Sequence, residues 1–279
     1  PYWGVLEGLN NIKPPVRLSA TPYIVLQAQH YPEQSSGKDI SSSFGGGMDM
    51  KYGINESFTL DMSLLPDFSQ VQSDNKVKNL TAFETVYSEQ RPFFKEAVDL
   101  FMKGDIFYSR RIGKTPTLFY SVEDSLKEGE SISKNPVQQR LVNATKVSGR
   151  NKKGLAIGVL NAVTANTYAT LSDVENNQRK VLTDPATNYN LLVFDQALKN
   201  NSNVYITNTN VIRGSNFRDA NVTASGITLN DKSNTYRFSL SGGMSQVFMP
   251  AEAENQRSTV RGFKYGISAS KTNGNLNGP

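Results

Sequence analysis

The chain has 279 residues, of which 37% are hydrophobic, and a formal net charge of +5 at pH 7. It contains no Cys and a single His, His30, which excludes disulfides, thiolate metal sites and multi-histidine metal sites. No run of about 18 apolar residues occurs, which excludes a transmembrane helix, and the thin spread of Lys and Arg argues against a nucleic-acid partner.

Strand-like alternation dominates the chain after a short lead-in. Residues 1–16 contain the pair Pro14–Pro15, which removes two backbone donors, so they predict an ordered lead-in rather than a strand. From Arg17 onward, apolar and polar side chains alternate with a period of two, which is the pattern of a β-strand. About ten such segments follow, most of them about 10 to 13 residues long. Their ranges are 17–29, 44–54, 57–64, 138–147, 154–165, 189–198, 204–213, 217–229, 235–245 and 262–269.

The connections between these segments predict antiparallel hairpins. Asn55–Glu56 and Asn200–Asn201 have the composition of tight turns. Longer polar stretches alternate with the short turns. In one of them, residues 166–187, few side chains are apolar, and we expect a long exposed loop there.

Segment length decides between two all-β architectures. A tilted strand needs about 9 to 11 residues to cross a bilayer, whereas about five or six are common in soluble sheets. Alternation alone fits a soluble β-sandwich or a β-solenoid equally well, and these remain the alternatives. The Gly- and Ser-rich polar faces with isolated charges favour a crowded aqueous lumen. We therefore expect an all-β fold in which residues 17–279 form an antiparallel transmembrane β-barrel.

The stretch 66–136 departs from this pattern. Alternation breaks at Pro66, and no period is kept for about 50 residues, which is unusual in a compact domain unless the loop lies inside a hollow one. We expect residues 66–136 to form a plug-like insertion in the lumen. Arg91–Pro92 precedes a periodic run, and we expect a short helix over Phe94–Met102 with one packed face.

Motifs in the first part of the chain resemble a known family. The stretches PDFSQVQSD, NLTAFETVYSEQRPFFKEAVDLF and FYSRRIG are similar to a signature of Bacteroidota outer-membrane β-barrels of uncharacterised function. The stretches GLNNIKPPVRLSATPY and KVSGRNKKGLAIGVLNAVTA are similar to the same family. The resemblance covers most of residues 4–165, and beyond residue 166 it rests on strand rhythm.

The resemblance implies a location and a larger context for this chain. The location is the bacterial outer membrane, with outer-membrane lipid as the surrounding partner. A family-9-type carbohydrate-binding domain commonly precedes such barrels, so we expect one upstream, with a glycan as its ligand. The family's barrels are longer than these strands allow. We expect the wall here to be incomplete, because an unclosed edge in lipid leaves backbone groups unsatisfied.

The charged residues divide into two expected groups. Arg110 and Arg111, with Arg91, are candidates for anchoring the plug to wall carboxylates or for contacting an anion, because guanidinium groups pair with carboxylates. Strand parity predicts that the other group faces the lumen while the apolar residues between them face lipid. The lumen-facing candidates are Asp49, Lys51, Asp61, Arg237 and Lys264; the lipid-facing ones are Leu60, Met62, Phe238, Leu240 and Ile267.

Two functions of different classes fit these expectations. The first is a plugged channel or transporter, for which the resemblance suggests glycan-derived solutes. The second is a scaffold or subunit of an outer-membrane assembly whose barrel is permanently closed, with other outer-membrane or secreted subunits as partners. With His30 as the sole imidazole we expect no enzyme, and we expect neither cofactor nor metal.

Overall fold

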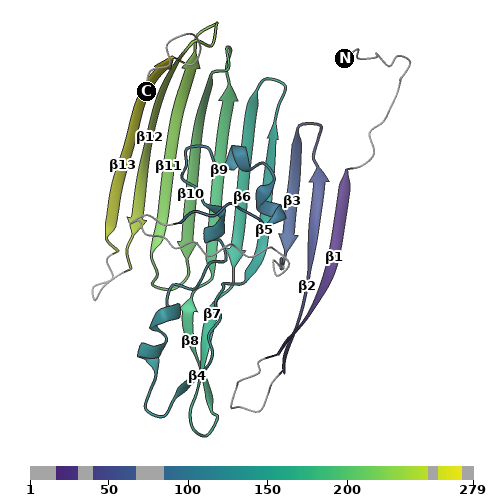
Figure 1. The fold of residues 1–279 in the computed structure, drawn as a ribbon, viewed down its shortest axis with the longest axis vertical. Coiled ribbons are helices and arrows are strands. Elements are labelled where there is room, and N and C mark those ends of the chain that lie inside the picture. The colour runs from purple at the N-terminus through teal and green to yellow at the C-terminus, as the bar shows by residue number, and fades with distance from the viewer. Residues whose placement is uncertain (1–16, 31–39, 67–84, 251–256, 272–279) are drawn as a thin grey trace.

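The computed structural model describes residues 17–30, 40–66, 85–250 and 257–271 (Figure 1). They form a ten-stranded and a three-stranded antiparallel sheet with a few single-turn helices. The strands are β1 Leu18–His30, β2 Ile40–Gly53, β3 Phe58–Leu64, β4 Ser131–Lys134, β5 Leu141–Arg150, β6 Leu155–Thr164, β7 Thr167–Ser172, β8 Gln178–Asp184, β9 Thr187–Ala197, β10 Asn203–Arg213, β11 Asp219–Asn230, β12 Tyr236–Phe248 and β13 Thr259–Lys271. The helices are α1 Pro92–Lys95 and α2 Val98–Phe101, and the 3-10 turns are Ser109–Arg111, Phe119–Ser121 and Glu123–Ser125.

The large sheet is a meander with two interruptions. Its order is β1-β2-β3-β5-β6-β9-β10-β11-β12-β13, and every neighbouring pair is antiparallel. The inserted elements between β3 and β5 and between β6 and β9 supply the small sheet, β4-β7-β8, which extends beyond one end of the large sheet (Figure 1). The predicted all-β antiparallel class is confirmed.

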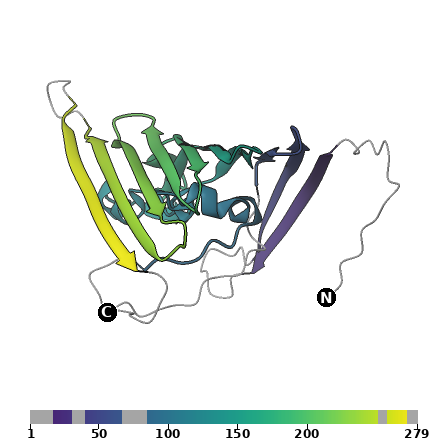
Figure 2. The same ribbon diagram turned by 90° about the horizontal axis from the view of Figure 1, so that it is seen from above.

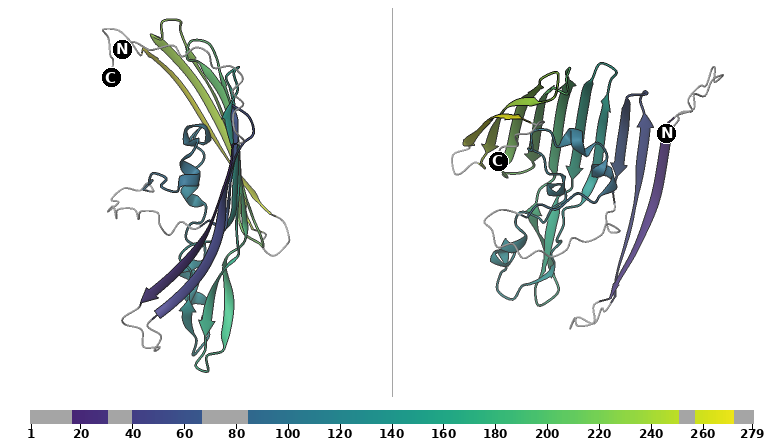
Figure 3. Two further views of the ribbon diagram at one scale, coloured as in Figure 1. Left: turned by 90° about the vertical axis from the view of Figure 1, so that its right-hand side faces the viewer. Right: turned by 45° about the horizontal axis from the view of Figure 1, so that its top comes forward.

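The large sheet is curved and open. Seen from above, β1 and β13 form two separate edges, and the single-turn helices lie in the hollow between them (Figure 2). A side view shows the same helices on one side of the sheet only (Figure 3). We call this side the concave face and the opposite side the convex face. Among the described residues the strands do not close into a barrel, so closure of the predicted barrel stays a prediction.

Alternating side chains divide between the two faces as a pleated strand requires. In β9, Val193 is fully buried on the concave face, while its neighbours Leu192 and Phe194 are 39% and 37% exposed on the convex face. The β9–β10 connection contains Asn200 and Asn201 with φ of 56° and 55°, as expected for a tight hairpin turn. The ten segments predicted as strands correspond to the ten strands of this sheet.

The prediction of a long exposed loop over residues 166–187 is wrong. Strands β7 and β8 occupy most of this range, and β4 lies within the predicted plug stretch and pairs with β7. The apolar side chains here are few but alternate: Ala169 and Leu171 are fully buried and pack against Val122. The strands are short, so alternation over six or seven residues was a weak signal.

The predicted helix Phe94–Met102 is also corrected. The chain forms two separate turns, α1 and α2, because Ala97 between them has a left-handed φ of 57°. Phe94 and Phe101 are buried as expected, whereas Val98 is 39% exposed. No helix in the described part of the chain has the length and apolar content needed to cross a membrane.

Candidate functional site

The concave face carries residues 85–114, which we call the inner segment. Its aromatic side chains Phe94 and Phe101 pack with Ile112 onto buried residues of β5, β6 and β9. The wall side of this core consists of Leu141, Ala144, Leu160, Ala162, Tyr189, Leu191 and Val193. Gly158 in β6 makes room for it, since a Cβ built there would lie 2.8 Å from Phe101 Cε1. Half of the concave face is therefore a hydrophobic core rather than an open lining.

A buried lysine joins the inner segment to the wall. Lys146 of β5 is 1% exposed, and its Nζ donates to the carbonyl oxygen of Phe93 and, at 3.1 Å, to that of Glu96. The same ammonium lies 3.9 Å from Asp61 Oδ2 and 3.8 Å from Glu96 Oε2. It also lies 4.7 Å from the centre of the Phe93 ring, a distance suited to a cation–π contact. Lys146 thus fixes both the backbone and a side chain of the segment.

The predicted wall residues Lys51 and Asp61 belong to the same cluster. They are direct cross-strand partners in β2 and β3, and Asp61 is the partner of Lys146 in β5. Lys51 Nζ lies 2.7 Å from Glu96 Oε1 and 3.7 Å from Asp61 Oδ1. The hydrogen bond from Lys51 lowers the pKa of Glu96, so this carboxylate of the inner segment stays ionised.

A second ion cluster fastens the segment further along. Asp195 of β9 is 2% exposed and forms an ion pair with Arg150 of β5. Asn203 Nδ2 donates to its Oδ1 at 3.0 Å, and Lys103 Nζ, which follows α2, lies 3.5 Å from the same oxygen. The sheet thus presents the buried ammonium of Lys146 to Glu96, which lies between the two single-turn helices, and the buried carboxylate of Asp195 to Lys103, which follows them.

The predicted anchors Arg91 and Arg110 act inside the segment. Arg91 bridges to Glu89, with Nε to Oε1 at 2.9 Å and Nη2 to Oε2 at 2.7 Å. It also donates to the carbonyl oxygens of Ser109 and Ile112, both at 2.8 Å, and so joins the start of the segment to its end. Arg110 Nε donates to the carbonyl oxygen of Ser88 at 2.9 Å.

Glu89 illustrates how strongly the segment is organised. Its burial works to raise the pKa, but hydrogen bonds from Arg91 and Ser109 outweigh that effect and lower it to about 2. Arg111 contacts the wall through its main chain, where its carbonyl oxygen accepts from Tyr189 Oη at 3.5 Å. The wall contacts of Lys103 and Lys146 were not predicted. The available signal was a lysine at a concave position of β5, next to Asp61 on the neighbouring strand.

The concave face of β10–β13 has a different lining, which we call the hydroxyl trough. Its side chains are small or hydroxyl-bearing in β11–β13, and among them stand the predicted residues Arg237 and Lys264. The concave positions of β12 and β13 are Arg237, Ser239, Ser241, Gly243, Ser245, Val247, Val260, Gly262, Lys264, Gly266, Ser268 and Ser270. A cavity of about 330 Å³ lies here between residues 104–106 of the inner segment and the strands.

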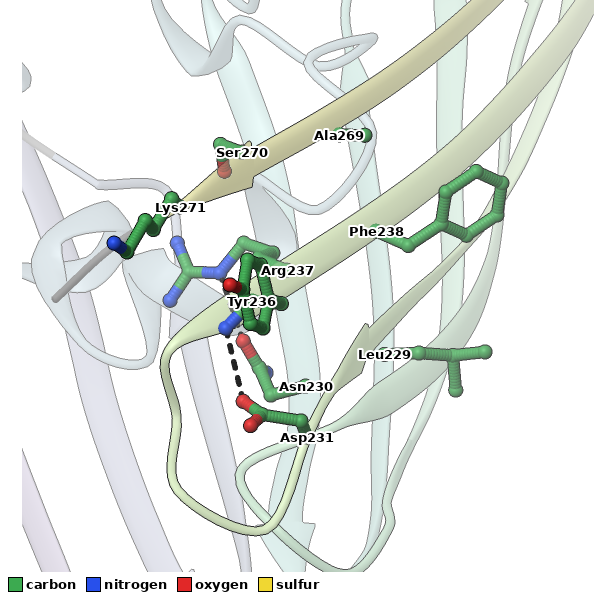
Figure 4. Close-up of a pocket in the computed structure, with 9 residues that line it drawn as sticks. All are labelled: Leu229, Asn230, Asp231, Tyr236, Arg237, Phe238, Ala269, Ser270 and Lys271. Atoms are coloured by element: carbon green, nitrogen blue, oxygen red, sulfur yellow. Dashed lines mark hydrogen bonds between the residues drawn. The ribbon is translucent and has the colours of Figure 1, made fainter. Parts of the chain in front are cut away.

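A second cavity, of about 550 Å³, lies at the ends of β11–β13 (Figure 4). Arg237 Nε donates to Asn230 Oδ1 at 3.0 Å, and the backbone nitrogen of Tyr236 donates to Asp231 Oδ1 at 2.9 Å. Figure 4 shows the charged ends of Arg237 and Lys271 at the same end of this cavity. Arg237 occupies a concave position at this end of the sheet, whereas Leu229, Phe238 and Ala269, which also line the cavity, occupy convex positions.

The convex face has an apolar part and an amide part. The amides hydrogen-bond across strands: Asn161 Nδ2 donates to Asn188 Oδ1 at 2.6 Å and Asn190 Oδ1 at 2.8 Å. Asn208 Nδ2 donates to Asn221 Oδ1 at 3.0 Å. We call this group the amide row; its members are Asn161, Asn188, Asn190, Asn208, Asn210, Asn221 and Gln246.

The apolar part contains large exposed side chains. Phe263, Tyr265 and Ile267 of β13 are 75%, 85% and 71% exposed. Towards the other edge, Ile24, Leu26 and Phe44 are 73%, 80% and 74% exposed. Large apolar side chains are thus exposed at both edges of the convex face; when such side chains form a contiguous patch, the patch usually marks an interaction or membrane-facing surface.

Comparison with known proteins identifies a family and little else. A family model described as Domain of unknown function (DUF5916) matches residues 14–278. No curated protein and no solved structure matches the chain. Within the described residues, no group of three or more Asp, Glu or His side chains is arranged to bind a metal ion.

Proposed function

We propose that this chain, which belongs to the DUF5916 family, forms the wall and the plug of an outer-membrane β-barrel that works as a plugged channel or transporter. The wall is the ten-stranded sheet, its convex face lies against lipid, and the inner segment is the plug. The finer resemblance to Bacteroidota barrels preceded by a family-9-type carbohydrate-binding domain, and with it glycan-derived solutes, is part of the same proposal.

One observation carries it: from β3 to β11 the boundary of the apolar convex surface runs obliquely across the strands. In β6 and β9 the boundary lies at one level, because the apolar pair Val159–Leu192 stands next to the amide pair Asn161–Asn190. In β10 the boundary lies one same-face residue nearer the β9–β10 turn, since the polar Asn208 is the cross-strand partner of the apolar Leu192.

From β10 to β11 the boundary moves further towards the end of the sheet that holds the β9–β10 turn. Towards β3 it moves to the opposite end. The polar Ser225 is the cross-strand partner of the apolar Ile206, so the apolar part of β11 ends one same-face residue before that of β10. In β12 and β13 the boundary returns to the level of β9, since the apolar pair Met244–Phe263 stands next to the polar pair Gln246–Arg261. In β3 the convex side chains Leu60, Met62 and Leu64 are apolar to the end of the strand. Val163 and Ile212 are apolar side chains beyond the line. Strands that tilt in a bilayer require such an oblique boundary, because the membrane surface crosses them at an angle.

The lining of the concave face supports a passage. In β12 and β13 the concave side chains are mostly serine and glycine with Arg237 and Lys264, whereas β11 adds small apolar ones such as Val222 and Ala224, and the inner segment leaves a cavity beside them. The segment itself fills the other half, which is what a plug does.

A second candidate, the permanently closed scaffold, has its own observation. The inner segment shares a hydrophobic core with the wall and is fastened through Lys146 and Asp195. A gate that opens must break these contacts. Other subunits of an outer-membrane assembly are the partners on this view.

Depth-dependent quenching tests the membrane placement. The chain has no Cys, so single-cysteine variants can be labelled cleanly with a fluorophore in vesicles containing brominated lipids. Phe194→Cys should be quenched by bromines in the acyl chains, whereas Asn188→Cys, on the same strand and face, should be quenched only from the headgroup region. Ser239→Cys, on the concave face, is the control for both. A label at position 194 that no lipid quencher reaches would overturn the proposal.

A further inference from the structure

We propose that the hydroxyl trough is the path of small anions, with Lys264 as the binding group midway and Arg237 at the rim. This inference rests on the proposed passage and names the class of solute. It concerns the concave face of β10–β13, whereas the core of the inner segment lies on β5, β6 and β9.

The charge inventory of the trough is the first argument. The concave positions of β10–β13 include three cationic side chains, Arg213, Arg237 and Lys264, and no carboxylate. The remaining positions in β12 and β13 are serine, glycine or valine. A lumen lined by cationic side chains and hydroxyls without carboxylates favours anions.

The second argument concerns Lys264 and Arg237, since Arg213 interacts with the carboxylate of Asp184. Among the described residues no carboxylate lies within ion-pair distance of Lys264, and Arg237 donates to the amide oxygen of Asn230. The lysines beneath the plug behave differently: Lys51 and Lys146 each face Asp61 and Glu96. Lys51 and Lys146 are thus neutralised by the carboxylates that they bind, whereas Lys264 is available to a ligand.

The third argument is the space around Lys264. The cavity of about 330 Å³ is lined by Lys264 together with Ser241 and Ser245, whose hydroxyls can donate to an anion. Tyr205 closes one side, since its ring packs against Gly104 and Gly226. Asp105 of the inner segment also lines the cavity, so one carboxylate opposes one ammonium. We therefore expect a modest preference for anions rather than strict selectivity.

Reversal potentials in planar bilayers test this inference. The folded wild-type protein, in a tenfold gradient of potassium chloride, should give small currents with a chloride-to-potassium permeability ratio of about 2 or more. Lys264→Glu should bring that ratio below one, and Lys264→Arg should keep it. The matched control is Lys180→Glu, which makes the same change of charge in β8 of the small sheet.

The outcomes separate the two proposals. Current with no preference for chloride, or with a preference that Lys264→Glu leaves unchanged, overturns the anion path and leaves the passage standing. No current from protein whose circular dichroism shows intact strands overturns the anion path and favours the permanently closed scaffold. A shift of equal size in Lys180→Glu also overturns the anion path, because it would place the selectivity outside the trough.

Discussion

The two halves of the concave face use the same strand alternation for opposite purposes. In β5, β6 and β9 the concave side chains include Leu160, Leu191 and Val193, and the inner segment buries them. In β12 and β13 the same positions are serine and glycine, and no described segment packs over most of them. Side-chain size on one face, rather than strand propensity, thus decides which part of the sheet packs against the inner segment.

The largest expected effect is the loss of the buried charge beneath the plug. Lys146→Met should lower the free energy of unfolding by about 3 to 5 kcal/mol, because Asp61 loses its buried partner and keeps only the half-exposed Lys51. Lys264→Met, in the hydroxyl trough, should change it by no more than about 0.5 kcal/mol. Urea titrations followed by circular dichroism in one detergent measure both. Similar losses in the two variants would remove the distinction between the halves.

Acid should weaken the covered half selectively. The pKa of Glu89 is lowered from 4.5 to about 2 in the folded chain, so its contribution is complete above pH 4.5 and is lost as the pH falls towards 2. The contribution is roughly 2 to 3 kcal/mol. In Glu89→Gln the acid limb of the stability curve should be flatter over this range. Glu56→Gln, at an exposed turn, is the control and should follow the wild type.

Two glycines on the same face should respond differently to an added side chain. Gly158→Val drives a Cβ to within 2.8 Å of Phe101 Cε1, and we expect a loss of about 1 to 3 kcal/mol from overpacking. Gly243→Val meets its nearest atom, a backbone oxygen, at 3.3 Å and otherwise faces the trough, so the loss should be smaller. Thermal unfolding of both variants gives the comparison; a greater loss at Gly243 would contradict it.

The smallest expected effect is the loss of single hydroxyls from the hydroxyl trough, which tests whether these side chains are free of buried hydrogen bonds. Ser241→Ala and Ser268→Ala remove hydroxyls from concave positions of β12 and β13, and each should change stability by no more than about 0.5 kcal/mol. The same urea titration measures them. A loss near that of Lys146→Met would mean that these hydroxyls belong to a buried network.

Elements with a long local sequence pattern could be predicted, and elements with a short pattern or none could not. The ten long strands were predicted because alternation over ten or more residues is a strong local pattern, and the facing of Asp61 and Lys264 follows from strand parity alone. The small sheet was missed since its strands are short. The break at Ala97 was missed because a left-handed alanine has no local signature.

The contacts of the inner segment lay beyond sequence reasoning for another reason. Which arginine reaches the wall depends on how the segment folds on itself, and Arg91 and Arg110 both turn inward to its own backbone. The pairing of Glu96 with Lys51, 45 positions apart, needs the three-dimensional path of the chain. Non-local packing of an aperiodic segment is where pattern arguments end.

The small sheet is connected to both the inner segment and the large sheet, so a force applied to it reaches both. Immediately after it, Leu118 donates to the carbonyl oxygen of Thr183 at 3.0 Å, and β4 pairs with β7. A pull on this sheet is therefore shared between the inner segment and strands β6 and β9. Those strands are bonded along their whole length, whereas side chains provide the described contacts that fasten the segment to the wall. We expect the inner segment to separate from the large sheet before these strands separate from each other, so a force on the small sheet acts first on the inner segment.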